Sequence, residues 1–430
     1  MPPFPMLIDF TVSNFRSIKE PQTLSMLATK AGENPDNVIK VDDSLRVLKT
    51  AVIYGANGSG KSNVIKALNA FKSLLRHSSI LMPRDRIEQY QPFKLDKSCL
   101  DKPTVIEIEF SDINNIRYKY TVKFNDHEII NESLFFYPKN KEAKLFIREK
   151  GKAIDSGDSL KGAKLSIEKQ LLPNQLFISK AANNNHEQLG RIYRTLLAVG
   201  GISILDKSDY TSPIAKTILT IIDTGDIFDQ VGTLLKNADT GIEKTYLKEE
   251  KIRFKDVSAT NDSDESSPEI RTSHKMYDGE KEIGTTAFNL YEESEGTQKL
   301  FDLGGAILFL MSSGQTVIID ELNNSFHPLI TEMLIKLFHN PKTNPKNAQL
   351  IFTTHDTSIF KPELFRRDQI WFTEKDKYGA TSLYSLSEFK FDKVRSNVPF
   401  DKWYLSGRFG ALPLIKDFNF SGDAEAKEGE

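Results

Sequence analysis

The sequence predicts an α/β fold, in which a mixed, largely parallel core sheet carries an antiparallel β-meander and an inserted helical subdomain. One observation is the apolar run "VLKTAVIY" (47–54), which ends in a glycine-rich loop followed by helical spacing. A second is the period-two alternation between residues 104 and 149, with turn residues between the runs, which is typical of antiparallel strands. The third is the alternation of helix and strand patterns from residue 287, which predicts parallel strands.

Composition excludes several classes of protein. The chain has 430 residues, of which 39% are hydrophobic and 27% charged, as in an ordinary folded protein. It contains no run of eighteen apolar residues, and its first residues lack a basic segment, so we expect neither a membrane span nor a secretory signal. A single cysteine excludes an internal disulfide and fits a reducing cytosol. A net charge of −2 gives no global basic field for nucleic acid.

Element by element, the chain begins with two strands within 7–28, broken at "KEP", and reaches the meander after the glycine-rich loop and its helix. Residues 180–255 show helical spacing, without the sustained heptads of a coiled coil. Strands "TVIIDEL" and "QLIFTTHD" then alternate with helices over 295–312 and 328–338, before the strand "QIWFTEK". We therefore expect an N-terminal lobe, a helical insert with an acidic loop, and a C-terminal lobe, at 1–175, 176–286 (loop 259–269) and 287–430.

The glycine-rich loop has the pattern G-x-x-x-x-G-K-S from Gly55 to Ser62, which is the P-loop pattern. Glycines explain the bend, but they do not explain the lysine and serine that follow. Glycines also let backbone N–H groups surround a phosphate, at the positive end of the helix dipole. We expect Lys61 to reach the β- and γ-phosphates and Ser62 to ligate Mg²⁺. The candidate nucleotide-binding residues of the loop are Asn57, Gly58, Ser59, Gly60, Lys61 and Ser62.

Two acids close the apolar strand "TVIIDE" (316–321), at the sheet edge where ligands sit in open α/β sheets. Carboxylates so close to a hydrophobic core are costly to desolvate, so their presence calls for a functional explanation. In a chain with a P-loop that explanation is a Walker B element, although a solvated strand end is the plainer alternative. Asp320 would then hold the hydration shell of Mg²⁺, and Glu321 would orient the attacking water and accept its proton.

Two further segments are candidates for contacts with phosphate. "QLIFTTHD" (349–356) is a buried strand, and its placement suggests that His355 faces the γ-phosphate as a hydrogen-bond donor; a satisfied polar histidine is the alternative. "ESEGTQKL" (293–300) begins a helix, where Ser294 is either a plain N-cap or part of an N-terminus that meets the ATP of a second subunit.

With these motifs in this order, and with "NFRSI" (14–18) near the start, the chain resembles an ABC-type ATPase head of the SMC/RecF-like branch. It is more closely similar to compact AAA-family ATPases of bacterial anti-phage, abortive-infection systems, of the AbiL/RloA, PARIS and Septu kinds, among which the sequence does not choose. The segments that carry this likeness are "QPFKLD" (91–96), "LFISKAANNN" (176–185), "DQIWFTEKD" (368–376) and "YLSGRFGALP" (404–413).

The resemblance implies a homodimer, or a higher homo-oligomer, in which each ATP lies between one P-loop and the partner's signature segment. Ser294 and Gly296 would then touch the γ-phosphate in trans. Arg16 would approach the phosphates, or be a surface arginine, and Gln91, with Gln89 as a rival, would sense Mg²⁺ and water. The chain departs from the transporter-type pattern in Glu295, where a glycine is usual, and in the D-loop segment "LNNSFHP" (322–328). There Asn324 and Ser325 would cross the interface, unless His327 and Pro328 simply start a helix.

The resemblance therefore implies a cytoplasmic bacterial ATPase that senses a trigger, DNA or a phage protein, and controls a separately encoded nuclease or toxin. Only 75 residues follow His355, too few for an added nuclease domain of the Toprim kind. A RecF/SMC-like DNA repair ATPase is an alternative that only a basic groove would distinguish. An ATP-dependent scaffold with slow hydrolysis is another, disfavoured by Glu321. The "NFRSI" motif and the helical insert disfavour a transporter subunit.

Overall fold

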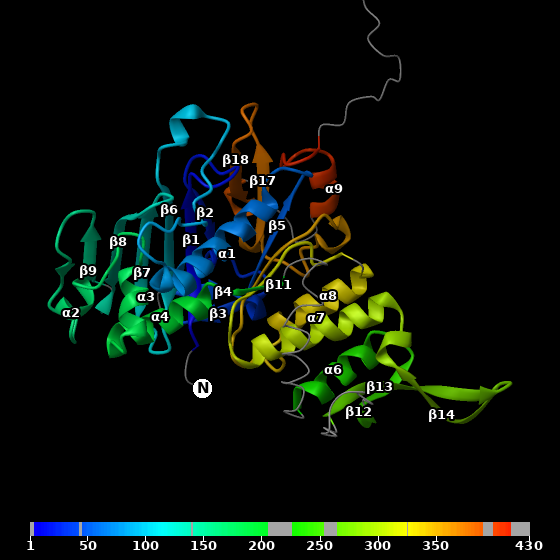
Figure 1. The fold of residues 1–430 in the computed structure, drawn as a ribbon. Helices are drawn as coiled ribbons and strands as arrows, with labels where there is room; N and C mark the ends of the chain where they lie inside the picture. Colours follow the sequence, from blue (N-terminus) through cyan, green and yellow to red (C-terminus); the bar gives the residue numbers. More distant parts are fainter. Residues whose placement is uncertain are drawn as a thin grey trace, which may run out of the picture.

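The computed structural model describes residues 4–42, 45–138, 141–204, 226–252, 265–324, 326–389 and 399–413. Two large sheets lie side by side in these residues, one of six and one of seven strands, with α1 between them (Figure 1). Helices α7 and α8 cover the other face of the six-stranded sheet. The helices are α1 (Lys61–His77), α2 (Leu165–Glu168), α3 (Phe177–Asn183), α4 (Glu187–Val199), α6 (Asp226–Asn237), α7 (Glu295–Ser312), α8 (Pro328–His339) and α9 (Phe400–Leu405).

The central sheet has six strands in the order β11-β15-β16-β5-β17-β18. All neighbours in it are parallel except β17 and β18, which form an antiparallel pair. This confirms the predicted mixed, largely parallel core sheet and its α/β class. Its strands are β5 (Thr50–Gly55), β11 (Ile202–Ile204), β15 (Val317–Ile319), β16 (Leu350–Thr353), β17 (Ile370–Lys375) and β18 (Thr381–Ser385).

The second sheet has seven strands in the order β10-β9-β8-β7-β6-β1-β2, all antiparallel. Strands β6 to β9 form the predicted meander, and buried residues alternate with partly exposed ones along β6 and β7. The sheet therefore buries one face only, against α1, α3 and α4. Its strands are β1 (Met6–Ser13), β2 (Gln22–Ser25), β6 (Thr104–Ser111), β7 (Arg117–Phe124), β8 (Ile129–Phe136), β9 (Ala143–Glu149) and β10 (Asp155–Ser156).

The interval 176–286 contains the expected helices α3, α4 and α6, but the prediction of helix up to residue 255 is wrong. Residues 242–252 form β12, part of an antiparallel sheet with β13 (Glu265–Asp278) and β14 (Lys281–Asn289). Strand β12 is stabilised by its pairing with β13, which the spacing within one segment cannot reveal. Residues 205–225 and most of the acidic loop lie outside the described residues. The division of the chain at residues 175 and 286 stays a prediction.

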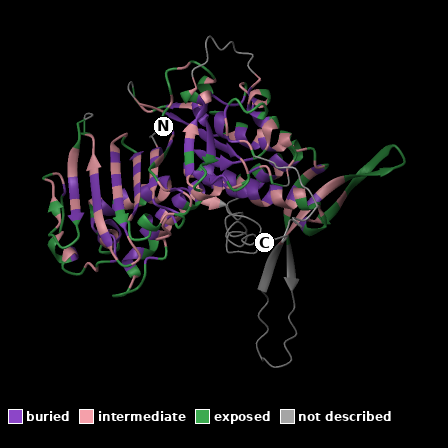
Figure 2. Cartoon of the chain, turned by 90° about the horizontal axis from the view of Figure 1, so that it is seen from above, coloured by how far each residue is buried: buried purple, intermediate pink, exposed green. Residues whose placement is uncertain are grey.

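Two hydrophobic cores lie on opposite faces of the central sheet. Ala51 and Ile53 of β5 face the core shared with α1 and the meander, whereas Val52 and Tyr54 face the core formed by α6, α7, α8 and α9. Because side chains alternate along a strand, β5 contributes to both cores and is buried along its whole length (Figure 2). Figure 2 also shows the exposed β13–β14 hairpin projecting from the body.

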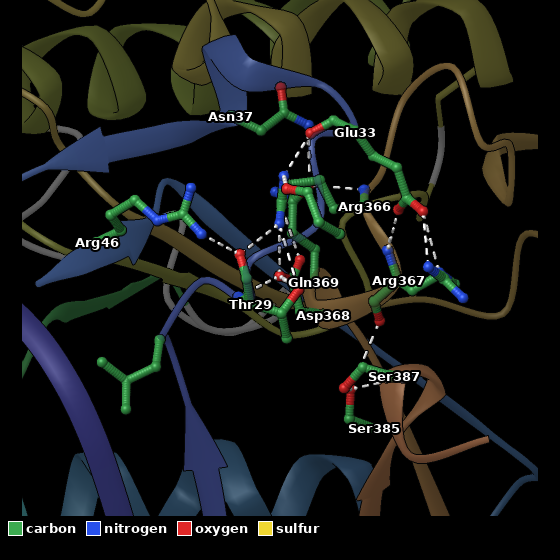
Figure 3. Close-up of polar contacts among 12 residues, drawn as sticks. Thr29, Glu33, Asn37, Arg46, Arg366, Arg367, Asp368, Gln369, Ser385 and Ser387 are labelled. Carbon is green, nitrogen blue, oxygen red and sulfur yellow. Dashed lines mark hydrogen bonds and ion pairs between the residues drawn. The ribbon is translucent and has the colours of Figure 1, made fainter. Parts of the chain in front are cut away.

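A buried polar cluster fastens the N-terminal segment to the start of β17 (Figure 3). Arg366 is 1% exposed and donates from Nε and Nη2 to the carboxylate of Asp368, at 2.9 and 2.8 Å. The backbone N–H and the hydroxyl of Thr29 donate to the same carboxylate, at 2.7 and 2.8 Å. Arg366 also donates to backbone carbonyls of the segment, so residues more than 300 positions apart hold each other in place. The β3–β4 hairpin, Val38–Lys40 and Arg46–Leu48, follows in this segment.

Candidate functional site

Three of the predicted motifs, namely the P-loop, the two acids after β15 and the segment with His355, meet at one edge of the central sheet. Strands β15, β16 and β5 are neighbours and parallel, with Ile319 opposite Phe352 and Thr353 opposite Ile53. Parallel strands end at the same edge, so the residues that follow them come together. Asp320 follows β15, His355 follows β16 and the P-loop follows β5.

The P-loop backbone has the conformation that its glycines allow. Gly60 has φ +115° and is the N-cap of α1, and no side chain caps the first turn of that helix. Its unfilled backbone donors therefore suit an anion. A Cβ at Gly60 would lie 2.2 Å from Thr381 Oγ1, and one at Gly55 would lie 2.5 Å from the carbonyl oxygen of Thr373. Glycine is thus required at both positions.

Lys61 is 6% exposed, and its ammonium donates to the carbonyls of Gly55 and Ala56, at 2.8 and 3.1 Å. Burial lowers the pKa of Lys61 to about 8, against the opposing effect of the Glu321 and Asp320 carboxylates. The positive charge is therefore held in the loop by neutral carbonyls and by carboxylates that lie within electrostatic reach. A phosphate would supply the counter-charge that this cation lacks at close range.

Other P-loop residues differ in what they can offer. Asn57 and Gly58 are exposed, and Ser62 is partly buried. The hydroxyl of Ser59 lies 2.6 Å from Thr373 Oγ1, and its backbone N–H donates to the Ala56 carbonyl at 3.1 Å. The hydroxyl and the backbone N–H of Ser59 are thus engaged within the loop and its neighbouring strand.

Thr353 fixes the two acids after β15, and the sequence analysis did not single it out. Its hydroxyl donates to Asp320 Oδ1 at 2.6 Å and accepts the backbone N–H of Glu321 at 2.8 Å. Glu321 has φ +55°, a left-handed conformation that a residue with a Cβ rarely adopts. A left-handed residue cannot continue the extended backbone of β15, and the Glu321 side chain is 45% exposed.

His355, which follows β16, lies close to the Glu321 carboxylate. Its Nε2 lies 3.7 Å from Glu321 Oε1. Burial, and next the charge of Lys61, hold the pKa of His355 below its usual value of 6.5, although the Glu321 and Asp320 carboxylates oppose this shift. The imidazole is therefore neutral at pH 7, with one N–H available as a donor. Lys61, Asp320, Glu321 and His355 are thus within electrostatic reach of one another; we call them the P-loop group.

The loop that contains "NFRSI" is attached to the P-loop through Ser17. The Ser17 hydroxyl accepts from Asn63 Nδ2 of α1 at 2.6 Å and lies 2.8 Å from Thr381 Oγ1, and the Ser17 carbonyl accepts from the Thr381 N–H at 2.7 Å. Thr381 Oγ1 is also 2.8 Å from the Ser59 carbonyl. Neither Ser17 nor Thr381 was a predicted site residue.

Arg16 and Gln91 lie next to each other, since the Arg16 N–H donates to the Gln91 carbonyl at 2.6 Å. The Arg16 side chain is exposed. The rival Gln89 donates to Ser73 Oγ at 2.9 Å, twelve residues along α1 from Lys61, which corresponds to about 18 Å of helix. Of the two glutamines, Gln91 therefore lies with the loop that contains Arg16.

Ser294 is the N-cap of α7, and its Oγ accepts the Thr297 N–H at 3.1 Å. Gly296 lies in the first turn of the same helix. Within the described part of the chain, no recorded hydrogen bond or ion pair joins Ser294 to the P-loop group. Asn324 is described, Ser325 lies outside the described residues, and His327 is the N-cap of α8, with Pro328 as its first residue.

Comparison with known protein families gives one match. The family described as "AAA domain, putative AbiEii toxin, Type IV TA system" matches residues 51–361. The chain belongs to this family. The AAA domain match begins in β5 and ends after His355, so it includes the whole P-loop group, whereas Arg16 precedes it. The predicted AAA-family ATPase class is thereby confirmed. No curated protein matches the chain.

Several solved structures are similar to this AAA chain. The SMC head domain from Thermotoga maritima is 13% identical with a TM-score of 0.41, covering 88% of this chain and 98% of that one. The Smc head domain with an extended coiled coil from Pyrococcus furiosus, bound to the C-terminal domain of ScpA, is 12% identical with a TM-score of 0.40, covering 89% and 96%. The recombination mediator protein RecF with ATP is 12% identical with a TM-score of 0.36, covering 89% and 99%.

In the described part of the chain, no helix is both long and apolar enough to cross a membrane.

Proposed function

We propose that this chain binds and hydrolyses ATP, closes as a head-to-head homodimer around it, and controls a separately encoded effector of a bacterial anti-phage system. The observation that carries the ATPase part is the convergence of Lys61, Asp320, Glu321 and His355 at the carboxyl edge of one sheet. The family match, which includes all four, supports it. The effector, nuclease or toxin, and the trigger, DNA or a phage protein, follow from the resemblance alone.

In this proposal Lys61 and the loop backbone bind the β- and γ-phosphates. Ser62 and Asp320 would hold Mg²⁺, with Gln91 as a third candidate, and the ion would supply charge stabilisation of the phosphates and of the leaving group. Thr353 keeps the Asp320 carboxylate in place through the 2.6 Å hydrogen bond.

Glu321 accepts a proton from the attacking water, and neutral His355 donates a hydrogen bond toward the γ-phosphate. Because Glu321 is 45% exposed, its carboxylate is open to water in the single chain. The signature segment of a partner, with Ser294 and Gly296, completes the site in trans and shields it. The exposure of Ser294 at the start of α7 is compatible with such a contact.

Nucleotide binding is tested first, with Lys61→Ala against Lys66→Ala, which removes an exposed lysine from the same helix. Loss of a charged contact to phosphate costs about 1.5–3 kcal/mol, so we expect Lys61→Ala to weaken ATP binding by about 10- to 100-fold. Lys66→Ala should bind as the parent does. Equal affinity of the parent and Lys61→Ala for ATP would overturn the assignment.

Hydrolysis and dimerisation are tested together with Glu321→Gln. Loss of a general base costs about 10²- to 10⁴-fold in rate, so this variant should bind ATP, hydrolyse it slowly and accumulate as a dimer in sedimentation velocity. Adding Ser294→Arg should abolish the dimer while single-site binding remains. A parental rate for Glu321→Gln would remove the base assignment, and full activity of a monomer at high dilution would refute the shared site.

A further inference from the structure

The segment before α7, the helix that has Ser294 as its N-cap, is attached to the β12–β14 sheet through the carboxylate of Glu293. Oε1 of Glu293 accepts hydrogen bonds from the Thr272 hydroxyl and from Nε2 of His274, the latter at 2.8 Å. Thr272 is fully buried, and the Glu293 side chain is 10% exposed. Residues two apart point to the same face of a strand, so β13 presents both donors side by side. We call this three-residue contact the carboxylate clamp.

The two donors of the carboxylate clamp lie next to Phe288 of β14. The His274 ring packs edge-on against Phe288 of β14, with centroids 5.1 Å apart. Thr272 lies opposite Phe288 in the strand register, which places both donors above a paired part of the sheet. The clamp therefore has a rigid base, although the β13–β14 hairpin beyond it is exposed.

The same residue is joined to the start of α7. The Glu293 carbonyl accepts from Gln298 Nε2 at 2.8 Å, and Ser294 follows directly as the N-cap. The capping contacts of Ser294 and Thr297 are local, so they form helix α7 without the sheet. The contacts of Glu293, in contrast, reach residues about twenty positions earlier in the chain, and they determine where the N-terminus of the formed helix lies.

We propose that Glu293 is a positioning residue, clamped by Thr272 and His274, that holds the Ser294 segment where it meets the ATP bound by a partner subunit. This inference rests on the proposed ATP-sandwich dimer. It gives the β12–β14 sheet a role in catalysis, namely to set the trans half of a site whose cis half lies on other elements.

The first test compares Glu293→Ala with Glu282→Ala, which breaks an exposed ion pair with Lys275 in the same sheet. ATP affinity should be parental in both variants, because the P-loop is untouched. A misplacement of catalytic parts by about 1 Å can cost about 10²-fold, so we expect hydrolysis by Glu293→Ala to fall by about 10- to 100-fold. Thr272→Val removes one donor and keeps the side-chain shape, so its hydrolysis rate should also fall, but by less. This variant replaces Glu293→Ala in the test if Glu293→Ala does not fold. Parental hydrolysis by both clamp variants would overturn the proposal.

Subunit mixing separates a trans role from a merely structural one. Glu293→Ala chains are mixed with Lys61→Ala chains, each nearly inactive alone. A mixed dimer contains one site with an intact P-loop and an intact Ser294 segment, so hydrolysis should rise to about a quarter of the parental rate, since half the dimers are mixed and half their sites intact. The reference mixture pairs Ser294→Ala with Lys61→Ala, because the larger Ser294→Arg change is expected to block dimerisation itself. If only the reference mixture regains hydrolysis, Glu293 acts on the site of its own chain and this inference fails. If the reference mixture does not regain hydrolysis, the proposed shared site itself fails.

Discussion

At the scale of single residues, Lys61 carries a charge that the surrounding protein only partly balances. Its neighbours within hydrogen-bond distance are two neutral carbonyls, and burial lowers its pKa to about 8. A bound polyphosphate would favour the charged form and raise that pKa again. Nucleotide binding and proton binding at Lys61 are therefore linked.

This linkage predicts proton uptake on binding of Mg-ADP. At pH 8.5, above the lowered pKa of about 8, most Lys61 side chains in the free protein are neutral, so binding should take up at most about three quarters of a proton. At pH 6.5 Lys61 is charged in both states, and this uptake should vanish. Calorimetry in buffers of different ionisation enthalpy measures it, with Lys66→Ala as a control that keeps the uptake. Binding without uptake at pH 8.5 would show that Lys61 does not meet the phosphates.

Glu321 shows strain at a candidate catalytic position. Its φ of +55° costs a residue with a Cβ about 1 kcal/mol or more, whereas glycine adopts this conformation freely. Glu321→Gly should therefore unfold with a free energy about 1 kcal/mol higher than Glu321→Ala, while both lack hydrolysis. Chemical denaturation of the two variants checks this, since the alanine variant keeps the Cβ. Equal stabilities would mean that the backbone relaxes and that no strain is stored there.

At the scale of elements, the sequence predicted those whose pattern is local and periodic. The meander strands, β5 with its glycine-rich loop, and helices α7 and α8 all lie where their spacing placed them. Strands β12 to β14 were missed because each is stabilised by pairing with the neighbouring strand, which the spacing within one segment does not show.

The same distinction holds for the site. Lys61, Asp320, Glu321 and His355 follow from motifs, and the structure brings them together. Thr353 and Thr381 were not predicted as site residues, because threonine is ordinary in strands. Their contacts with Asp320 and Ser59 arise only when the strands take their register. Sequence spacing contains no signal for such cross-strand contacts.

The polar cluster at the start of β17 gives a prediction about stability. Asp368→Ala would leave the guanidinium of Arg366, 1% exposed, without its carboxylate. Removing one partner of a buried ion pair costs about 3–5 kcal/mol, and the free energy of unfolding should fall by that amount. The matched control is Glu33→Gln, which breaks the partly exposed pair with Arg367 and should cost at most about 1 kcal/mol. Similar losses in urea denaturation of the two variants would show that the cluster does not fasten the N-terminal segment.

At the scale of the whole molecule, the two cores share β5, which also leads into the P-loop. Neither core is complete without this strand, because its side chains alternate between them. Unfolding of the core on either side of the central sheet should therefore expose β5 and cause the other core to unfold as well. Ligand binding at the P-loop should in turn stabilise both cores together.

The two tryptophans of the chain allow this to be measured, since Trp371 lies in the core with α1 and Trp403 packs against the core with α7. The variants Trp371→Phe and Trp403→Phe each leave one reporter. Within each variant, the remaining tryptophan's fluorescence and the far-ultraviolet circular dichroism should give one urea midpoint, because a shared strand makes unfolding cooperative. Mg-ADP at about 100 times its dissociation constant should stabilise both variants by about 2.7 kcal/mol. A fluorescence midpoint that separates from the circular dichroism, or a ligand effect seen by Trp371 alone, would mean that the two cores unfold independently and that nucleotide binding acts on the P-loop side only.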